Sequence, residues 1–343
     1  MAARIAINGF GQTGRMALRA AMRAAGREVE VLAVNDMAEP AVLAGLFARD
    51  SVQGRFPGEV TVDGQTVWVG GHPVRFLAEP DVTALPWKDL DVEVVIEAAD
   101  RFTSRDEAAG HLAAGARRVV VSAPAKGADA TFVIGVNEAT FDPARHFVVS
   151  NASCTTNCLA VLAKVLDDAF EIEEGLMTTV HSYTGDQRLV DAAHHDPRRS
   201  RAAAVNIVPT STGAAQTTGV VLSPVEGHLD GLALRVPVPD GSLTDLVALV
   251  RQQPTAESVN AAYQQAAHSV DLRRGRPRRS GRILEYASEP LVSTDVIGST
   301  ASCIFDPGLT MVTGRLVKVL GSYDNEAGYA ARLIDLAALI GAA

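Results

Sequence analysis

The chain has 343 residues, of which 47% are hydrophobic and 21% are charged, and its formal net charge is −9. These values indicate a globular protein with room for two domains, and the negative charge argues against wholesale binding to nucleic acid or to an anionic membrane. Three cysteines do not make a disulfide framework, and no uncharged apolar run reaches the roughly 18 residues of a membrane span. We therefore expect a cytoplasmic protein without a signal peptide.

The first elements predict a nucleotide-binding unit. An apolar strand at Arg4–Asn8 runs into a Gly-x-Gly-x-x-Gly turn at Gly9–Gly14, and a helical segment follows at Arg15–Ala25. Strand, turn and helix in this order are the context that the dinucleotide fingerprint requires. The first glycine permits the tight turn, the second lets the backbone approach a pyrophosphate, and the third allows close packing of helix on strand. We expect the pyrophosphate at the helix N-terminus.

A second apolar strand, Val29–Asn35, ends at Asp36. Its carboxylate follows the glycine turn at about the 20-residue spacing expected for an acceptor of ribose hydroxyls, although a turn-capping aspartate stays an alternative. The segment Phe56–Phe76 alternates like an inserted antiparallel patch. A crossover helix is predicted over Arg105–Gly115, and further strands are predicted at Val92–Glu97, Val119–Ser122, Thr131–Gly135 and Phe147–Ser150. Alternating strands and helices predict a doubly wound sheet.

The stretch Ser153–Cys158 reads as a tight turn after a strand, followed by a helix that begins at Cys154. A thiol at a helix N-terminus feels the positive end of the helix dipole, which favours the nucleophilic thiolate. The surrounding Ser, Thr and Asn residues are a poor environment for an inert core thiol. We therefore predict Cys154 as a nucleophile, and Cys158 and Cys303 as buried core residues.

After this helix, an apolar strand ends at His181. A histidine there could take the proton of a thiol, although a structural role is about equally expected for it. The hydroxyl-rich element Pro209–Ala214 stands at a predicted helix start and suits an anion. Arg235 lies inside the apolar strand Leu232–Val238, where an arginine is costly unless it pairs with a carboxylate or a phosphate.

The remainder of the second half favours an antiparallel sheet covered by helices, because alternation returns over Val236–Val250. The polar string Asp324–Glu326 precedes a predicted terminal helix, Ala330–Leu339. A run of arginines at Arg273–Arg282 is typical of a solvated loop, with a contact to an anion or an acidic partner as the alternative.

Taken together, these strings resemble phosphorylating glyceraldehyde-3-phosphate dehydrogenase along essentially the whole chain. The most specific matches are Ser153–Cys158 and Pro209–Ala215. The resemblance implies an α/β Rossmann NAD-binding domain over residues 1–153 and an α+β catalytic domain with a mainly antiparallel sheet over residues 154–323. It also implies a helix at about 324–343 that packs back on the first domain, and a homotetramer.

The implied reaction is the glycolytic, NAD-dependent oxidative phosphorylation of glyceraldehyde 3-phosphate to 1,3-bisphosphoglycerate. Cys154 would form a thiohemiacetal and then a thioester, and His181 would activate it. The positions that match the site for the substrate's phosphate are Thr184, Asp186 and Arg235. Those that match the site for inorganic phosphate are Ser153, Thr155, Arg199, Thr212 and Gly213. Those that match the cofactor site are Gly9, Phe10, Gly11, Gln12, Thr13, Asp36, Ser122, Asn325 and Tyr329. No metal, nucleic acid or membrane is implied.

Several positions depart from the family pattern, at Gln12, Thr13, Pro80, Ala98–Asp100, Ser322 and Ala327. All catalytic matches are retained, so the leading interpretation is an active but divergent enzyme. Three alternatives stay open. They are an enzyme like erythrose-4-phosphate dehydrogenase, an isoform of the same activity that resists a thiol-directed inhibitor, and a non-catalytic binding paralogue.

The cofactor preference rests on two features with opposite effects. Asp36 would hold the ribose hydroxyls of NAD and repel the 2′-phosphate of NADP, and Asp100 would add negative charge. Against this, Asp191–His194 resembles the small-residue loop of NADP-using relatives. An unpaired carboxylate beside a phosphate is repulsive, whereas room alone does not stabilise a dianion. The sequence therefore predicts NAD as the cofactor, with NADP as a weaker alternative.

Overall fold

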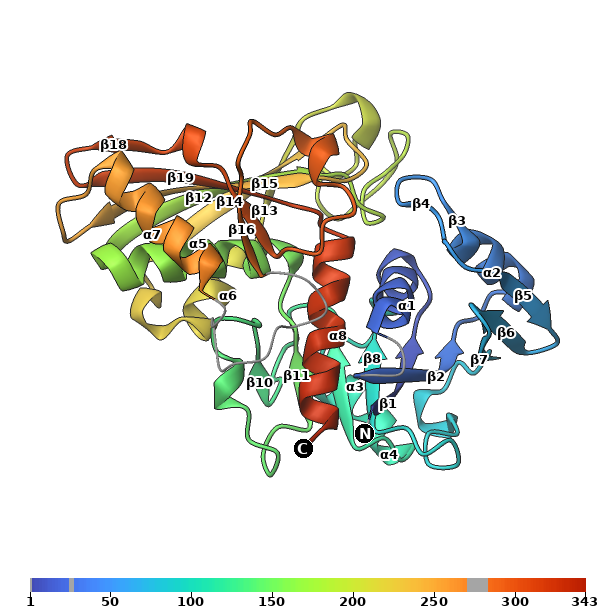
Figure 1. Ribbon diagram of the computed structural model, residues 1–343. Helices are drawn as coiled ribbons and strands as arrows, with labels where there is room; N and C mark the ends of the chain where they lie inside the picture. The colour runs from blue at the N-terminus through green and yellow to red at the C-terminus, as the bar shows by residue number, and fades with distance from the viewer. Residues whose placement is uncertain (1, 25–27, 270–282) are drawn as a thin grey trace. The chain divides into compact units, whose positions relative to one another are not determined.

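The computed structural model describes residues 2–24, 28–269 and 283–343, and these form two compact units (Figure 1). The first unit comprises the described residues up to Ile134 together with Glu138–Ala152 and Ala330–Ala343. The second unit comprises Gly135–Asn137 and the described part of Ser153–Tyr329. The solvated loop predicted for the arginine run at Arg273–Arg282 lies outside the described residues.

The first unit is built on a sheet with the strand order β10-β11-β9-β8-β1-β2-β7-β6-β5. Its strands from β10 to β7 pair in parallel, while β7, β6 and β5 pair antiparallel. The strands are β1 (Ala3–Asn8), β2 (Val29–Asn35), β5 (Val60–Asp63), β6 (Thr66–Val69), β7 (His72–Leu77), β8 (Val94–Glu97), β9 (Arg118–Val121), β10 (Ala130–Thr131) and β11 (Val148–Ser150). This order confirms the Rossmann-type sheet. The predicted antiparallel patch extends it, because β7 pairs with β2.

The helices of this unit are α1 (Gln12–Ala24), α2 (Pro40–Ala48), α3 (Arg105–Ala108) and α4 (Gly110–Ala113), and a hairpin is formed by β3 (Arg49–Asp50) and β4 (Gly54–Arg55). The crossover segment predicted over Arg105–Gly115 is helical, but it forms two short helices, α3 and α4, separated by Ala109, which keeps helical backbone angles (φ −63°, ψ −14°). Gly110 starts α4 so close to Val82 that a Cβ on the glycine would lie 2.6 Å from the Val82 side chain. The predicted strand Thr131–Gly135 is also shorter than expected, since only Ala130–Thr131 is extended.

Helix α8 (Ala327–Gly341) ends the chain, and its part from Ala330 onward belongs to the first unit. Arg118 on β9 donates from Nη1 to the carbonyl of Ile340, at 2.9 Å, and to that of Ala343, at 3.2 Å. These bonds satisfy carbonyls at the helix C-terminus that have no partner within the helix. They tie the end of the chain to the central sheet of this unit.

The second unit is built on a mixed sheet with the order β13-β14-β12-β15-β19-β17-β16, to which β18 adds beside β19. The strands are β12 (Ile172–Ser182), β13 (Val208–Ser211), β14 (Leu229–Val236), β15 (Ser242–Val250), β16 (Leu284–Tyr286), β17 (Cys303–Phe305), β18 (Met311–Thr313) and β19 (Leu316–Tyr323). Two pairings, β12 with β14 and β16 with β17, are parallel, and the others are antiparallel. The predicted mainly antiparallel sheet is confirmed.

Helices α5 (Cys154–Phe170), α6 (Ala214–Val221) and α7 (Ala256–His268) cover one face of this sheet (Figure 1). Tyr263 of α7 stacks on Phe305 of β17, with their ring centroids 3.9 Å apart. Cys158 and Cys303 are both fully buried in this core, as predicted. Among the described residues, no helix combines the length and hydropathy that a membrane span needs.

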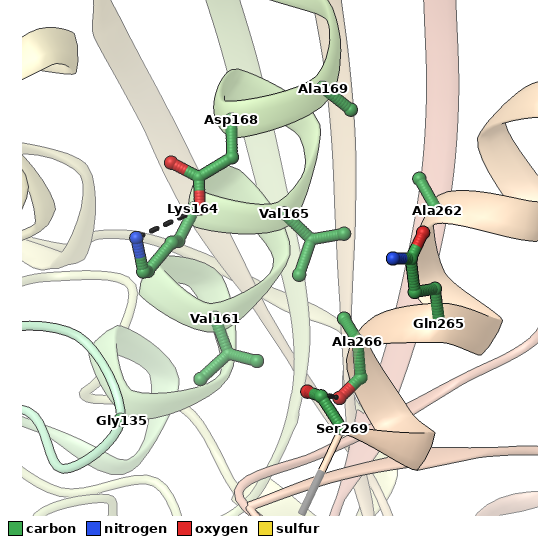
Figure 2. A pocket seen from close by; sticks show the side chains of 10 residues that line it. All are labelled: Gly135, Val161, Lys164, Val165, Asp168, Ala169, Ala262, Gln265, Ala266 and Ser269. Atoms are coloured by element: carbon green, nitrogen blue, oxygen red, sulfur yellow. Dashed lines mark hydrogen bonds and ion pairs between the residues drawn. The ribbon is translucent and has the colours of Figure 1, made fainter. Parts of the chain in front are cut away.

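Two hollows lie in the second unit away from the predicted catalytic residues. The first, of about 450 Å³, is lined by α5 and α7, where Lys164 pairs with Asp168 beside Val161 and Val165 (Figure 2). The second, of about 620 Å³, is lined by strand residues of β12, β14, β15 and β19, including the exposed Leu176 and Leu316. Neither contains a residue that the sequence assigns to catalysis.

Candidate active site

Helix α5 begins at Cys154, and the preceding residue caps it. Ser153 has an extended backbone (φ −108°, ψ 165°), and its hydroxyl accepts a hydrogen bond from the Thr156 N–H at 3.0 Å. Such an N-cap stabilises a helix by about 1 kcal/mol. The buried Ala152 lies in the left-handed region at φ +55°, which is uncommon for a residue with a Cβ. A capped helix start after a strained turn fixes where the thiol lies.

His181 lies near the end of β12 and is the partner of this thiol. Its Nε2 is 3.3 Å from the Cys154 Sγ, and the residue is only 4% exposed. Its Nδ1 is 2.8 Å from the carbonyl oxygen of Ser182 and 2.9 Å from Nη1 of Arg235. If Nδ1 donates to the Ser182 carbonyl, Nε2 has no proton; if Nδ1 accepts from Arg235, Nε2 has to carry the proton.

The register of the sheet places Arg235 beside His181, because these two residues are opposite each other in the parallel pair β12–β14. Nη1 of Arg235 has two protons, and it has two acceptors in the Ser182 carbonyl, at 3.1 Å, and the Thr184 hydroxyl, at 3.0 Å. Arg235 thus needs no bond to His181. The imidazole can donate from Nδ1 to Ser182, which leaves the Nε2 lone pair facing the thiol.

The electrostatics of the pair are dominated by burial. Burial raises the pKa of the Cys154 thiol to about 11, although Arg235 and the N–H and hydroxyl of Thr155 act in the opposite direction. Burial, together with the charge of Arg235, lowers the pKa of His181 to about 3. Both groups are therefore neutral at neutral pH. The N–H groups of the helix start do favour the thiolate, as predicted, but burial opposes them and has the larger effect on the pKa. The thiol proton has to move to His181 as the sulfur attacks.

A polar loop after β12 extends the site from Arg235. The Thr184 hydroxyl bonds to the carboxylate of Asp186, and Arg199 pairs with the same carboxylate. Arg199 also donates to the Thr210 hydroxyl from Nε, at 2.9 Å, and from Nη2, at 2.8 Å. Burial alone would raise the pKa of Asp186, but the Thr184 bond and the two arginines more than offset it and lower that pKa. Two cations and several hydroxyls thus converge around one ionised carboxylate.

Three other residues predicted for inorganic phosphate have no described hydrogen bond to this cluster of Thr184, Asp186, Arg199 and Arg235. Thr212 and Gly213 lie at the start of α6, where the Thr212 hydroxyl accepts the Ala214 N–H at 3.2 Å. The Thr155 hydroxyl faces inward and lies 2.9 Å from the hydroxyl of Tyr323. The described contacts therefore connect Arg199, Thr184, Asp186 and Arg235, while Thr212, Gly213 and Thr155 are placed by their elements only.

Asn325 is held by two serines of the same unit. Its Oδ1 accepts from the Ser182 hydroxyl, at 2.9 Å, and from the Ser242 hydroxyl, at 2.7 Å. With both lone pairs of this oxygen engaged, the amide nitrogen is left to donate to another group. Tyr329, on α8, is 7% exposed.

Sequence reasoning missed Tyr323 and Ser242 as parts of the site. The Tyr323 hydroxyl bonds to Thr155 and Thr179, and its ring lies edge-on to His181 with the centroids 6.1 Å apart. Ser242 begins β15, and its hydroxyl also accepts the Ser182 N–H at 3.1 Å. No spacing pattern connects these residues along the chain, because β12, β15 and β19 meet only through sheet pairing.

The glycine turn of the first unit has the geometry of a nucleotide site. Gly9 has φ +88°, and a Cβ there would lie 2.5 Å from the Ala99 nitrogen, so only glycine fits. A Cβ on Gly14 would lie 2.0 Å from the Gly9 carbonyl oxygen. A Cβ on Gly11, by contrast, would meet nothing within 4 Å, so its backbone is open to a ligand at the start of α1.

Asp36 is fixed against this turn. Its Oδ2 accepts the Phe10 N–H at 2.8 Å, and its Oδ1 accepts the Ala38 N–H at 3.0 Å. Gln12 donates to Asp50 at 3.1 Å, beside Thr13. Ser122 follows β9, with its N–H bonded to the Glu97 carbonyl at 2.9 Å. An open glycine backbone at a helix start, with a carboxylate beside it, fits the pyrophosphate and ribose of a dinucleotide.

Comparisons with known proteins agree with both halves of this description. Residues 3–105 match the family model "Glyceraldehyde 3-phosphate dehydrogenase, NAD binding domain", and residues 153–325 match "Glyceraldehyde 3-phosphate dehydrogenase, C-terminal domain". The chain is 53% identical over 341 residues to glyceraldehyde-3-phosphate dehydrogenase 2 of Streptomyces arenae, covering 99% of each chain. It is 50% identical to glyceraldehyde-3-phosphate dehydrogenase of Geobacillus stearothermophilus, covering 99% of this chain and 98% of the relative.

Proposed function

The chain belongs to the glyceraldehyde-3-phosphate dehydrogenase family, as an NAD-dependent oxidoreductase that oxidises and phosphorylates glyceraldehyde 3-phosphate, and we propose that Cys154 and His181 carry out this reaction. The observation that carries the proposal is the 3.3 Å contact between Sγ and Nε2 at a capped helix start. Arg235 and the polar loop beside this pair supply positive charge for a phosphorylated substrate.

The reaction begins when Sγ attacks the aldehyde carbon and His181 Nε2 takes the thiol proton. His181 then passes the proton to the former carbonyl oxygen, which gives a thiohemiacetal on Cys154. NAD, which the glycine turn at Gly9–Gly14 and Asp36 would hold, would supply the acceptor for the hydride that leaves this carbon. His181 takes the hydroxyl proton of the thiohemiacetal, so a thioester remains on Sγ.

Release of the product uses inorganic phosphate. A phosphate oxygen attacks the thioester carbon, the bond between carbon and sulfur breaks, and Cys154 leaves as a thiolate that His181 protonates again. Arg199, Ser153, Thr155 and the turn of Thr212 and Gly213 would hold this phosphate, as the family resemblance implies. The first N–H groups of α5, at the helix start that Ser153 caps, would stabilise negative charge on the reacting oxygen.

A direct assay tests the proposed function. Purified protein mixed with glyceraldehyde 3-phosphate, NAD and inorganic phosphate should form NADH, and omission of phosphate should limit the yield to about one NADH per active site. Erythrose 4-phosphate should react with a lower kcat/KM. A higher value for erythrose 4-phosphate would favour the first alternative, and no NADH from either substrate would favour a non-catalytic protein.

Arg235→Leu should raise KM for glyceraldehyde 3-phosphate roughly ten- to hundredfold, because a charge-assisted contact to the phosphate is lost. Unphosphorylated glyceraldehyde has no such contact, so its KM should change little. Steady-state kinetics with both substrates check this. Arg251→Leu is the matched control, because Arg251 is exposed and pairs with Glu171. Equal losses for both substrates would make Arg235 a support of the Ser182–Thr184 backbone instead of a phosphate ligand.

Asp36→Ala should lower the ratio of kcat/KM for NAD to kcat/KM for NADP, mainly by weakening the binding of NAD. The variant removes the acceptor for ribose hydroxyls and also the bond to Phe10 N–H. Asp63→Ala, an exposed change on β5, serves as the control. In the wild type, NAD should give the higher kcat/KM. A wild-type preference for NADP would mean that the Asp191–His194 loop, and not Asp36, decides the cofactor.

Assembly and location are further parts of the proposal. The open face of the second-unit sheet exposes Leu176 and Leu316 over a hollow of about 620 Å³, and a protein of this size would be expected to cover such a face. This supports a homotetramer, in keeping with the family resemblance, with the first unit as the nucleotide-binding domain and the second as the catalytic domain. We place the enzyme in the cytoplasm, where NAD and phosphorylated sugars are available. Sedimentation of the purified protein would test the tetramer.

A further inference from the structure

Two aspartates lie buried behind Asn325 in the second unit. Asp240 follows β14 and Asp324 follows β19, and each is 1% exposed. The antiparallel pair β15–β19 places Ser242 opposite Tyr323, so the turn that contains Asp240 lies beside the end of β19. Two neighbouring buried carboxyl groups repel each other if both are ionised, so one of them is expected to be protonated.

Both oxygens of the Asp324 carboxyl group act as hydrogen-bond acceptors. Its Oδ2 accepts the N–H of Gly298 at 2.6 Å, and its Oδ1 accepts the N–H groups of Glu326, at 2.8 Å, and Ala327, at 2.7 Å. Ala327 begins α8, so the carboxylate also faces the positive end of a helix. Three backbone donors therefore point at the oxygens of Asp324, which leaves Asp240 as the donor of a hydrogen bond between the two carboxyl groups.

Asp240 has to carry the proton of this pair. Its side chain is hydrogen-bonded to that of Asp324, and two carboxyl groups can share a hydrogen bond only if one of them is protonated. Its own Oδ1 accepts the Gly241 N–H at 2.7 Å. Burial, and then the charges of Asp324 and Glu326, raise the pKa of Asp240 to about 8.

The element packed on this turn from outside, Ser293–Val296, adds no positive charge to it. A Cβ on Gly241 would lie 2.2 Å from the Ser293 carbonyl oxygen, so this element presents backbone there. Its Asp295 turns away and accepts the Val292 N–H at 2.8 Å. The charged groups recorded against Asp240 are therefore Asp324 and Glu326, both acidic.

Both aspartates are close in sequence to Asn325 or to a residue that binds it. Asp324 directly precedes Asn325, and Asp240 stands two residues before Ser242, whose hydroxyl donates to the Asn325 oxygen at 2.7 Å. The bond between the two carboxyl groups therefore joins the end of β19 to the start of β15. Asn325 lies between them, since its backbone follows Asp324 and its side chain accepts a hydrogen bond from Ser242.

We propose that the proton shared by Asp240 and Asp324 is what positions Asn325, so that Asp240 is a positioning residue for the nicotinamide end of the cofactor. This inference rests on the proposed function and on the family resemblance, which assigns Asn325 to the cofactor site and implies that its side chain meets the carboxamide of NAD. When Asp240 loses the proton, two buried carboxylates face each other and repel. The strand ends then separate, Ser242 releases Asn325, and the enzyme holds the nicotinamide half of NAD less well while it still holds the ADP-ribose half.

The test compares the dissociation constants of NAD and ADP-ribose, measured by calorimetry at pH 7, 8 and 9. In the wild type, NAD affinity should fall up to about tenfold per pH unit above pH 8, while ADP-ribose affinity stays constant. In Asp240→Asn, the amide donates to Asp324 with no proton to lose, so NAD affinity should match the wild type at pH 7 and stay level to pH 9. Asp306→Asn, which changes a half-buried turn carboxylate that accepts the Gly308 N–H, should behave like the wild type. An alkaline loss of NAD affinity in Asp240→Asn as large as in the wild type would overturn the proposal.

A second measurement needs no cofactor. The unfolded chain loses the Asp240 proton near pH 3.8, whereas the folded chain keeps it to about pH 8. The stability from this proton is thus fully present below pH 3.8 and is lost as pH rises through about 8. Relative to Asp240→Asn, the unfolding equilibrium constant of the wild type should rise up to about tenfold per pH unit between pH 5 and 8. Parallel pH profiles of urea unfolding for the two proteins would contradict the shared proton.

The two proposals can fail separately. If Asn325→Ala leaves NAD affinity unchanged, the role of Asn325 in cofactor binding, and with it the positioning role of Asp240, is wrong. The unfolding profile would then still report on the carboxyl pair alone. If the protein forms no NADH but binds NAD with the predicted pH dependence, the proposed activity fails and the positioning role stands.

Discussion

Cys154→Ser is expected to abolish phosphorylating oxidation, to less than a thousandth of the wild-type kcat, while NAD still binds. A serine hydroxyl is far harder to ionise than a thiol and is a much weaker nucleophile at neutral pH, even with His181 beside it. The cap at Ser153 and the helix start are unaffected by the change, so the fold should be retained. NADH formation and NAD titration on the same preparation check both statements.

The chain offers a matched control for this variant. Cys303→Ala also removes a thiol, but Cys303 is fully buried in the core beside Cys158 and is not among the predicted site residues. It should keep most of the activity and lose some stability, as expected for a small buried side chain. If Cys154→Ser kept even a tenth of the wild-type activity, covalent catalysis through this residue would be wrong.

His181→Asn is expected to lower kcat by roughly 10²- to 10⁴-fold, the usual effect of removing a positioned acid–base group. Burial holds the pKa of Cys154 at about 11, so without a base the thiolate is scarce at neutral pH. Labelling of Cys154 by uncharged iodoacetamide should therefore slow in this variant. Its rate should rise nearly tenfold per pH unit from pH 7 to pH 10, as the thiol approaches its own pKa.

Iodoacetamide is preferable to iodoacetate for this experiment, because the latter is an anion and Arg235 would attract it. His72→Asn, an exposed change on β7 of the first unit, is the control and should label at the wild-type rate. Equal labelling rates for His181→Asn and the wild type across this pH range would show that His181 does not set the state of the thiol.

The sequence predicted the elements best where local chemistry dictates them. The glycine turn, β1 and β2 were predicted because apolar periodicity and a three-glycine spacing leave few alternatives there. The interruption of the crossover helix at Ala109 was not predicted, and neither was the close packing of Gly110 on Val82, because no local pattern reveals them. The same holds for the strand at Thr131–Gly135, which ends after two residues.

The site shows a similar division. Cys154 and His181 were found because each ends or begins an element in a polar setting, and Arg235 because an arginine in an apolar strand needs a partner. The roles of Tyr323, Ser242 and Asp240 depend on pairing among β12, β14, β15 and β19, which joins positions far apart in the chain. The direction of the Cys154 pKa was also out of reach, since it depends on burial that only the fold defines.

Mass spectrometry of the protein after mixing with glyceraldehyde 3-phosphate and NAD, without phosphate, tests the central claim most directly. The mechanism predicts one acyl group per chain, located on the peptide that contains Cys154, in step with one equivalent of NADH. Addition of inorganic phosphate should remove the acyl group and release an acyl phosphate. NADH formation with no mass increase on Cys154, or with the acyl group on another residue, would contradict the assignment of Cys154 as the nucleophile.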